Sequence, residues 1–309
     1  MILTVTLNAA LDVTYEVAAL VAHGTHRVQA VHERAGGKGV NAASVLTLLG
    51  VSATATGLAG GRVGDDIVAD LDRRGIPNAF FRCADGSRRT VNVVSASDGD
   101  ATIFNEPGPV VSGSEWAEVL AGLPALARSS GCAAVILAGS LPPGVPPDGY
   151  GQLVAALRET GVRVLLDADG PALRDGVRAG PDVVSPNLAE LRAATGERDL
   201  VAGARALQAA GATDVCVSCG AEGLAVLTRD GRMLRARLEA PLAGNPTGAG
   251  DAVAAAVAAG LGESPDWPQL LTAAVSWSAA AVLQPWGGAV AAADVARLRR
   301  DVEVWEEPR

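Results

Sequence analysis

The sequence predicts an α/β fold: a mostly parallel sheet covered by helices on both faces, with a small β-sheet attached as a lid. From about residue 50 onward, short β-branched runs alternate with helical patterns, and this alternation is typical of crossover connections between parallel strands. Two segments, 12–35 and 88–106, instead alternate polar and apolar residues, as strands with one solvated face do. The 309 residues are 49% hydrophobic, so the chain can bury a sizeable core.

The order of these patterns places each element. We expect strands of the main sheet at 51–57, 133–139, 162–167, 182–187, 214–219 and 223–228. The helical patterns cover 65–75, 114–128, 150–161, 188–196 and 204–211, several ending at a glycine as a C-cap would. A buried helix is predicted over 269–285, which is too short for a membrane span. The lid is inserted at about 12–35 and 88–106, with a turn at SDGD, 97–100. No low-complexity linker divides the chain, so we expect a single domain over 1–309.

Composition excludes several classes of function. The net charge of −9 argues against a nucleic-acid binder or a protein that binds anionic membranes, because both need a broad basic surface. Four cysteines and no signal-peptide pattern predict a reducing compartment and a cytoplasmic location. Cys216 and Cys219 form a C-x-x-C, which raises the alternative of a redox or metal pair. Because VCVSCG is typical of a strand, whose i and i+3 side chains point to opposite faces, we expect two small core residues instead.

The stretch NPTGAGDA, 245–252, is a candidate phosphate-binding site. Gly248, Ala249 and Gly250 let backbone N–H groups approach an anion, and the helix that follows has a partially positive N-terminus. Asp251 would lie in the first helical turn, where it could accept a proton from a hydroxyl nucleophile. The alternative is an ordinary capped turn with glycines for its geometry. The Rossmann fingerprint fails here because GAGDAV lacks its third glycine, and a Walker A loop fails at Lys38, which has no glycine at the required upstream position.

The stretch AGGKGVN, 35–41, is a second candidate binding loop. Gly36, Gly37 and Gly39 expose backbone N–H groups, and Lys38, the only lysine in the chain, supplies a positive charge. Asn41 offers donors and acceptors that suit sugar hydroxyls. The alternative is a solvated loop with an incidental lysine.

Together these motifs resemble the two signature regions of the ribokinase-like sugar kinases, the PfkB family. The resemblance extends over essentially the whole chain, through TLNAALD (6–12), FNEPGP (104–109), AGSLPPGVP (138–146), LLDADGPAL (165–173), SPNLAEL (185–191) and VSCGAEGL (217–224). Within the family, the sequence looks most like the 1-phosphofructokinase and tagatose-6-phosphate kinase branch. The resemblance implies a ribokinase-like three-layer fold with a β lid.

The resemblance also implies roles for individual residues. Asp251 matches the catalytic base, and the backbone of Thr247, Gly248, Ala249 and Gly250 matches the anion hole beside the nucleotide phosphates. The positions implied to hold the sugar are Asp12, Gly36, Gly37, Lys38, Gly39, Asn41 and Ser140. The positions implied to hold ATP are Asn187, Ser218, Gly220, Gly223, Val275 and Ala279.

Charged groups of the substrate complete the implied site. Asn187 and Glu190 match an N-x-x-E element associated with Mg²⁺, which implies an indirect contact through water, and their spacing puts both on one helix face. Arg89 aligns with an arginine that faces the substrate phosphate, with Arg27 and Lys38 as helpers. Arg88 is predicted to be a solvated neighbour on the opposite strand face. Ser185 replaces a lysine common in the family, which removes a positive charge near the nucleotide phosphates.

The activity implied is ATP-dependent and Mg²⁺-dependent phosphorylation of the primary hydroxyl of a phosphorylated ketohexose. Fructose 1-phosphate is the expected substrate, and tagatose 6-phosphate or fructose 6-phosphate is the alternative. A kinase for an unphosphorylated sugar or nucleoside, and a non-catalytic sugar-phosphate sensor, also remain open. The expected partners are small molecules and a second copy of the chain, because lids often pair in this family.

Overall fold

A ten-stranded sheet forms the centre of the molecule. The computed structural model describes residues 1–97, 99–240 and 242–308. The strand order is β14-β13-β12-β11-β10-β9-β8-β1-β4-β5. The strands are β1 (Ile2–Thr6), β4 (Ala53–Gly60), β5 (Asn78–Cys83), β8 (Ala134–Ala138), β9 (Arg163–Asp167), β10 (Val183–Val184), β11 (Asp214–Ser218), β12 (Leu224–Leu227), β13 (Met233–Leu238) and β14 (Val302–Glu306). The pairs from β11 to β5 are parallel, and β12, β13 and β14 add antiparallel strands.

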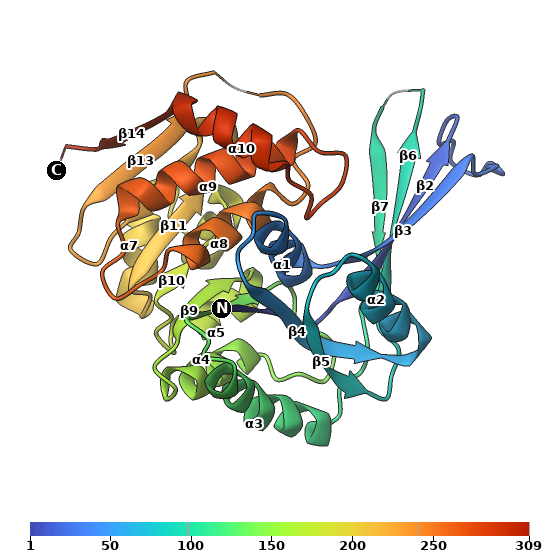
Figure 1. Ribbon diagram of the computed structural model, residues 1–309, viewed down its shortest axis with the longest axis horizontal. Helices are drawn as coiled ribbons and strands as arrows, with labels where there is room; N and C mark the ends of the chain where they lie inside the picture. The colour runs from blue at the N-terminus through green and yellow to red at the C-terminus, as the bar shows by residue number, and fades with distance from the viewer. Residues whose placement is uncertain (98, 241, 309) are drawn as a thin grey trace.

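Helices cover both faces of this sheet, so the fold has three layers (Figure 1). One layer contains α1 (Lys38–Leu48), α8 (Ala249–Ala259), α9 (Trp267–Val282) and α10 (Ala292–Leu298), packed in one hydrophobic cluster with the sheet. The other contains α3 (Gly113–Ser129), α4 (Gly149–Arg158), α5 (Gly170–Val177), α6 (Leu188–Thr195) and α7 (Leu200–Ala210). Cys216 belongs to the first cluster and Cys219 to the second. The prediction that the two cysteines are core residues on opposite faces is therefore confirmed.

A four-stranded small sheet projects from this body (Figure 1). Its order is β3-β2-β6-β7, with β2 (Ala10–Val17), β3 (Ala30–Gly36), β6 (Arg88–Ser95) and β7 (Ala101–Asn105). The back face packs Leu11, Val13 and Ala35 into a cluster with α2 (Gly61–Arg73). The other face carries Asp12 and Arg34, which are paired across β2 and β3, and we call it the site face. Part of the predicted SDGD turn, position 98, lies outside the described residues.

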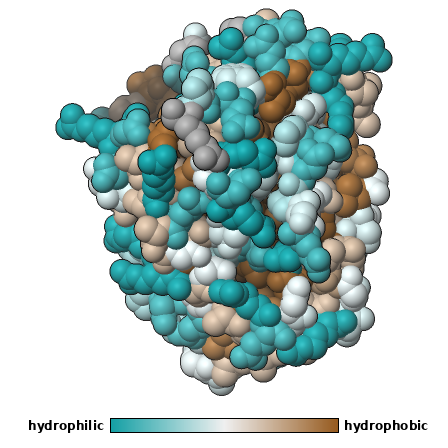
Figure 2. Space-filling view, turned by 90° about the vertical axis from the view of Figure 1, so that its left-hand side faces the viewer, coloured by the Kyte–Doolittle hydropathy of each residue, from teal (hydrophilic) through white to brown (hydrophobic). Residues whose placement is uncertain are grey.

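The edge strand β14 shows how the main sheet ends. Ion pairs cross from β13 to β14, with Arg235 Nε 2.8 Å from Glu307 Oε1 and Arg237 Nε 3.5 Å from Glu303 Oε2. The guanidinium of Arg237 also lies 5.4 Å from the ring centroid of Trp305. The face on which β14 lies mixes hydrophilic and hydrophobic residues without one dominant apolar area (Figure 2). Charged side chains thus protect an edge that would otherwise invite pairing.

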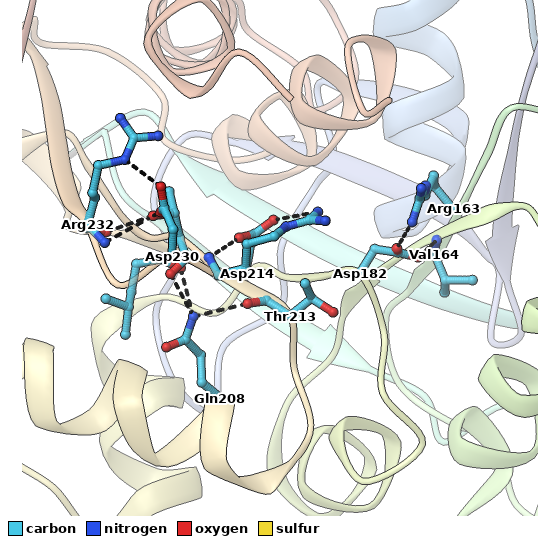
Figure 3. Close-up of polar contacts among 11 residues, drawn as sticks. Arg163, Val164, Asp182, Gln208, Thr213, Asp214, Asp230 and Arg232 are labelled. Atoms are coloured by element: carbon cyan, nitrogen blue, oxygen red, sulfur yellow. Dashed lines mark hydrogen bonds and ion pairs between the residues drawn. The ribbon is translucent and has the colours of Figure 1, made fainter. Parts of the chain in front are cut away.

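The amino ends of the parallel strands are closed by a polar network (Figure 3). Asp182 accepts hydrogen bonds from Arg163 Nη1 at 2.7 Å and from the amide of Val164 at 2.9 Å. Asp214 accepts from the amide of Arg229 at 2.6 Å and from its Nη2 at 3.4 Å. Each carboxylate therefore has both a backbone and a guanidinium donor.

The predicted fold class is confirmed, with two local differences. The strand predicted at 182–187 contains only Val183 and Val184, because Pro186 has no N–H to donate and Asn187 caps the next helix. No strand was predicted at β1, β5, β13 or β14, and the arginine-rich and glutamate-rich sequences of the last two hide their pairing. Among the described residues, no helix is long and apolar enough to cross a membrane.

Candidate active site

The predicted site residues gather at the carboxyl ends of the parallel strands. Ser140 follows β8, Asn187 follows β10, and Ser218 ends β11. Lys38 at the start of α1 and Asp251 at the start of α8 come to the same edge. This is the edge at which open α/β sheets bind ligands.

Two neighbouring cavities open at this edge. The larger, about 860 Å³, lies between the site face of the small sheet and the 244–247 loop, and Asp12, Asn41 and Thr247 line it. The smaller, about 540 Å³, is lined by seven predicted nucleotide residues, namely Asn187, Ser218, Gly220, Gly223, Gly250, Val275 and Ala279. Gly244 and Pro246 line both cavities. Most predicted nucleotide residues thus share one cavity, whereas only Asp12 and Asn41 of the predicted sugar-binding residues line the adjoining one.

Asp251 lies between the two cavities and is buried. Its Oδ2 accepts a hydrogen bond of 2.8 Å from Asn41 Nδ2. Burial and repulsion by Asp167 raise the pKa of Asp251 to about 7, although the Asn41 bond and the Lys38 charge oppose this rise. A carboxyl group with this pKa is suited to accept a proton near neutral pH.

The start of α8 presents unpaired backbone donors. Gly248 caps the helix in the left-handed conformation, φ 82°, and a Cβ there would lie 2.9 Å from the Cα of Gly287. A Cβ at Gly250 would meet nothing within 4 Å. Within the described residues, the amides of Gly248, Gly250 and Asp251 have no acceptor. These N–H groups and the helix dipole together can hold an anion.

Not every amide of the predicted anion hole is available. The amide of Thr247 donates to Asn245 Oδ1 at 3.0 Å, and the amide of Ala249 donates to the carbonyl of Pro246 at 3.1 Å. Asn245 also donates to the carbonyl of Pro285 at 3.0 Å. These bonds fix the loop before the helix, so Thr247 and Ala249 support the geometry of the site from behind.

The glycines of the 36–39 loop permit close packing. A Cβ at Gly36 would lie 1.9 Å from Asp12 Oδ2, and one at Gly39 would lie 2.5 Å from Thr6 Oγ1. Gly37 caps α1 with a φ of 109°, which L-residues rarely adopt. The loop therefore lets the Asp12 carboxylate and the first turn of α1 meet at the cavity.

Lys38 points toward the nucleotide side of the site. Its Nζ lies 2.9 Å from Asp167 Oδ1 and 3.6 Å from Glu190 Oε1. Burial lowers the pKa of this ammonium, but the charges of Asp167 and Glu190 outweigh that effect and raise it. The structure thus does not bring Lys38 together with Arg27 and Arg89, its predicted companions. Asp167 was quoted in the LLDADG motif but given no role, and it is the missing partner.

Asn187 and Glu190 form a capping box, so they do not simply share a helix face as predicted. Asn187 Oδ1 accepts the amides of Ala189 and Glu190, both at 2.9 Å, and Glu190 Oε2 accepts the amide of Asn187 at 2.8 Å. Glu190 Oε1 is turned toward Lys38. An isolated bridge also pairs Asn187 with Ser218. This motif thus joins the lysine to the smaller cavity.

The strand register reverses the predicted roles of Arg88 and Arg89. Residues Ala10 and Asp12 of β2 pair with Arg88 and Thr90 of β6, so Arg88 shares the face of Asp12. Arg88 donates to the carbonyl of Asn8 at 3.2 Å, and its charge lowers the pKa of Asp12. Arg89 is exposed on the opposite face. The prediction that Arg89 faces the site and Arg88 does not is wrong, because the pairing of β6 with β2 puts Arg88 on the face of Asp12.

Asp12 lies between two arginines. Burial raises its pKa to about 6, against the effects of a Thr90 hydrogen bond and of the charges of Arg88 and Arg34. Arg27 lies in the exposed connection between β2 and β3 and lines neither cavity. Within this chain, Arg27 therefore does not join the other predicted sugar-binding residues.

Ser140 is held by a residue that was not predicted. Asn8 Nδ2 donates to Ser140 Oγ and to the carbonyl of Pro107, both at 3.1 Å. Among the described residues, its Oδ1 is buried without a donor, and a Cβ at Gly108 would lie 2.1 Å from it. Asn8 belongs to TLNAALD and Gly108 to FNEPGP, so the two quoted motifs meet here. The place of Asn8 within the quoted TLNAALD motif was the sequence signal that could have identified it.

The fold and the arrangement of this site define a class, the carbohydrate kinases. A family model described as "pfkB family carbohydrate kinase" matches residues 5–291, and the chain belongs to that family. The predicted family is therefore confirmed.

Similar proteins narrow this class. The chain is 38% identical over 259 residues to a 1-phosphofructokinase of Rhodobacter capsulatus, covering 82% of this chain and 81% of that protein. It is 36% identical over 268 residues to a 1-phosphofructokinase of Xanthomonas campestris pv. campestris, covering 84% and 83%. A crystal structure of phosphofructokinase-2 from Escherichia coli in complex with potassium superposes with a TM-score of 0.90 at 27% identity, covering 97% of this chain and 98% of that one. The chain is thus an ATP-dependent sugar kinase.

Proposed function

We propose that the protein transfers a phosphoryl group from ATP to the primary hydroxyl of fructose 1-phosphate, giving fructose 1,6-bisphosphate. The observation that carries the proposal is the position of Asp251. Its hydrogen-bond partner Asn41 lines the larger cavity, and its neighbour Gly250 lines the smaller one. A hydroxyl bound on one side and a nucleotide bound on the other would therefore meet at this carboxylate. The names of the two curated relatives support the choice of substrate.

In the proposed reaction, Asp251 takes the proton from the attacking hydroxyl as its oxygen bonds to the γ-phosphorus. The bond from that phosphorus to the bridging oxygen breaks, and ADP leaves. The amides of Gly248 and Gly250 donate to the oxygens of the transferring group, because these N–H groups have no acceptor among the described residues. Phosphoryl transfer depends mainly on such positioning and charge stabilisation.

A divalent cation, which we propose is Mg²⁺, would neutralise charge on the nucleotide phosphates. The residues present fit an indirect role: Glu190 Oε1 is the carboxylate oxygen that the capping box leaves free, and Asn187 lines the nucleotide cavity. The described residues contain no group of three or more His, Cys, Asp or Glu placed to hold a metal. We infer that the ion arrives with the nucleotide and that Asn187 and Glu190 contact it through water.

The phosphate already on the sugar is proposed to bind near Arg88. This guanidinium is half-buried on the site face, where its charge acts on Asp12 and its Nε donates to the carbonyl of Asn8, the residue that holds Ser140. Asp12 would accept hydrogen bonds from ring hydroxyls. Since an arginine can contact a phosphate through two N–H groups, Arg88 would favour a phosphorylated sugar over a neutral one.

An ADP-release assay across a panel of acceptors tests the proposal. The panel contains fructose 1-phosphate, fructose 6-phosphate, tagatose 6-phosphate, fructose, ribose and adenosine. We expect the highest kcat/KM for fructose 1-phosphate and little release with the unphosphorylated acceptors. A preference for fructose 6-phosphate or tagatose 6-phosphate would replace the substrate, and a preference for a neutral sugar would remove the role of Arg88.

We also propose that the protein is a cytoplasmic homodimer joined through the small sheet. Val31, Ile103 and Phe104 on this sheet are each more than half exposed, at 54%, 55% and 57%. Apolar side chains exposed on a projecting sheet favour burial against a second copy of the chain. Sedimentation of the wild type and of Phe104→Asp tests the dimer, because the variant should sediment as a monomer. A monomeric wild type would contradict it.

A further inference from the structure

The loop that follows α9 contacts two residues that position Asp251: its hydrogen-bond donor Asn41, and Gly248, which caps α8. A Cβ at Gly288 would lie 2.9 Å from the Cα of Asn41, and a Cβ at Gly248 would lie 2.9 Å from the Cα of Gly287. Asn41 in turn donates to Asp251, and Gly248 caps the helix that carries Asp251. The backbone at 287–288 is therefore wedged between the hydrogen-bond donor of Asp251 and the start of α8. A shift of this loop would move both.

The carbonyl of Gly288 is the point at which this loop is held. It accepts hydrogen bonds from Ser44 Oγ of α1 and from Arg34 Nη2 of β3, the latter at 3.4 Å. Ser44 is itself fixed by Arg74 Nη2 at 2.6 Å. One donor thus comes from the rigid body of the molecule, and the other comes from the small sheet.

A second contact joins the same strand to the same loop. His32 and Arg34 are two residues apart on β3 and both line the larger cavity. The His32 ring lies 5.0 Å from the ring of Trp286, centroid to centroid. The small sheet therefore contacts the 285–288 loop at two successive site-face positions, directly across the cavity proposed for the sugar.

Arg34 is held less firmly than the arginines around it. Arg73 and Arg74 both pair with Asp70, whose Oδ2 also accepts the amide of Ala35 at 3.0 Å. Arg34 makes only the 3.4 Å bond to Gly288, and its Nε is buried without an acceptor among the described residues. A buried donor without a partner costs free energy, which a better-placed acceptor would recover. A small displacement of β3 would change this contact first.

We propose that Arg34 is a positioning residue for phosphoryl transfer. Through the Gly288 carbonyl it fixes the 285–288 loop against Asn41 and Gly248, so the orientation of Asp251 depends on the position of the small sheet. The inference rests on the proposed function, in which a bound sugar contacts that sheet. A sugar that draws β3 toward the cavity would tighten the Arg34 contact and align the base at the same time.

Arg34→Met tests the inference, with Arg73→Met as its matched control. Arg73 loses the same charge and lies beside the same Asp70, but it is mostly exposed and does not reach Gly288. We expect kcat to fall about tenfold to hundredfold in Arg34→Met, because small misplacements of reacting groups have effects of this size. KM for ATP should change less than about twofold, since Arg34 lies outside the nucleotide cavity. Arg34→Lys, which keeps one donor, should recover part of the loss, and Arg73→Met should match the wild type.

The shared acceptor gives a second test. Ser44→Ala removes the other donor to Gly288, so its effect on kcat should combine with that of Arg34→Met to less than the product of the two. Simple multiplication of the two effects would mean that they do not act through one carbonyl. A fall in kcat matched by an equal rise in both KM values and by a lower Tm would mean a merely structural role. Either result overturns the inference.

Hydrogen exchange tests the inference independently of the substrate. In the ligand-free protein, the hydrogen-bonded amides of Ala249, Ala252 and Ala289 should exchange about fivefold to thirtyfold faster in Arg34→Met than in the wild type. Arg73→Met should leave them unchanged. If no acceptor in the panel were phosphorylated, the proposed function would fail while this measurement still decided the role of Arg34. Unchanged exchange in Arg34→Met would overturn that role.

Discussion

The two ends of the main sheet carry aspartates in opposite situations. At the amino ends, Asp182 and Asp214 each accept from a guanidinium and from a backbone amide (Figure 3). At the carboxyl ends, Asp167 and Asp251 face a single ammonium, that of Lys38, and Asp251 has one side-chain amide donor. The residue type is the same, but the hydrogen-bond donors that reach each carboxylate differ.

This difference separates a structural role from a chemical one. Burial raises the pKa of Asp214 as well, but the amide and the guanidinium of Arg229 oppose that rise and donate hydrogen bonds to its carboxylate. A buried carboxylate that is short of donors and close to another keeps a raised pKa, as Asp251 does at about 7. Such groups can exchange a proton with a ligand, which is why carboxylates with perturbed pKa values cluster at functional sites. The carboxyl end of the sheet is therefore the chemical end.

Asp251→Asn should have the largest effect on activity. An amide cannot accept the hydroxyl proton, so we expect kcat to fall about 100-fold to 10,000-fold in a coupled ADP-release assay. The fold should survive: because the pKa of Asp251 is raised, ionising it costs stability as the pH rises through about 7. The variant should thus melt no lower than the wild type at pH 8. Turnover within a few-fold of the wild type would remove Asp251 from its role as base.

Arg88→Ala should have the next largest effect, on substrate binding. Losing a charge-assisted contact with the sugar phosphate should raise KM for fructose 1-phosphate about 10-fold to 100-fold and leave KM for ATP unchanged. Arg89→Ala is the matched control, because it is adjacent in sequence and lies on the opposite face of β6. Equal effects of the two substitutions would show that neither arginine singles out the phosphate.

The pH dependence of the wild type should report the carboxyl-end aspartates. The base must be ionised, so kcat/KM should be level above pH 7 and fall about tenfold per unit below it. Below about pH 6, protonation of Asp12 should steepen the fall. Asp167→Asn removes the repulsion on Asp251 and should move the fall to lower pH. A wild-type profile that stays level to pH 5 would be inconsistent with Asp251 as base.

The sequence was sufficient for the parts of this site that follow from local motifs. The small residues around Asp251 and the glycines near Lys38 identify both loops, and the nucleotide positions line one cavity as a group. What the sequence could not provide was the pairing of distant strands. The face of Arg88 depends on its register with Ala10, which no count along β6 reveals.

The hydrogen-bond donors that reach each aspartate were equally hidden in the sequence. Asp167 ends a strand much as Asp214 begins one, and only the fold shows that the first meets Lys38 while the second meets Arg229. Asn187 and Glu190 likewise have the spacing of a ligand pair and of a capping box, and both descriptions are compatible with one sequence.

Asp214→Asn should have the smallest effect on activity and a clear one on stability. Asp214 is fully buried, and its two oxygens accept from the amide and the guanidinium of Arg229. An asparagine offers one acceptor in place of two and leaves a guanidinium donor unpaired, so we expect a loss of about 1–3 kcal/mol in the free energy of unfolding. Because this network lies at the amino end, kcat and both KM values should match the wild type. Denaturant unfolding and steady-state kinetics on the same preparation measure both. Asp251→Asn should show the reverse pattern, and a fall in kcat for Asp214→Asn at unchanged stability would mean that the two ends of the sheet do not divide structure from chemistry.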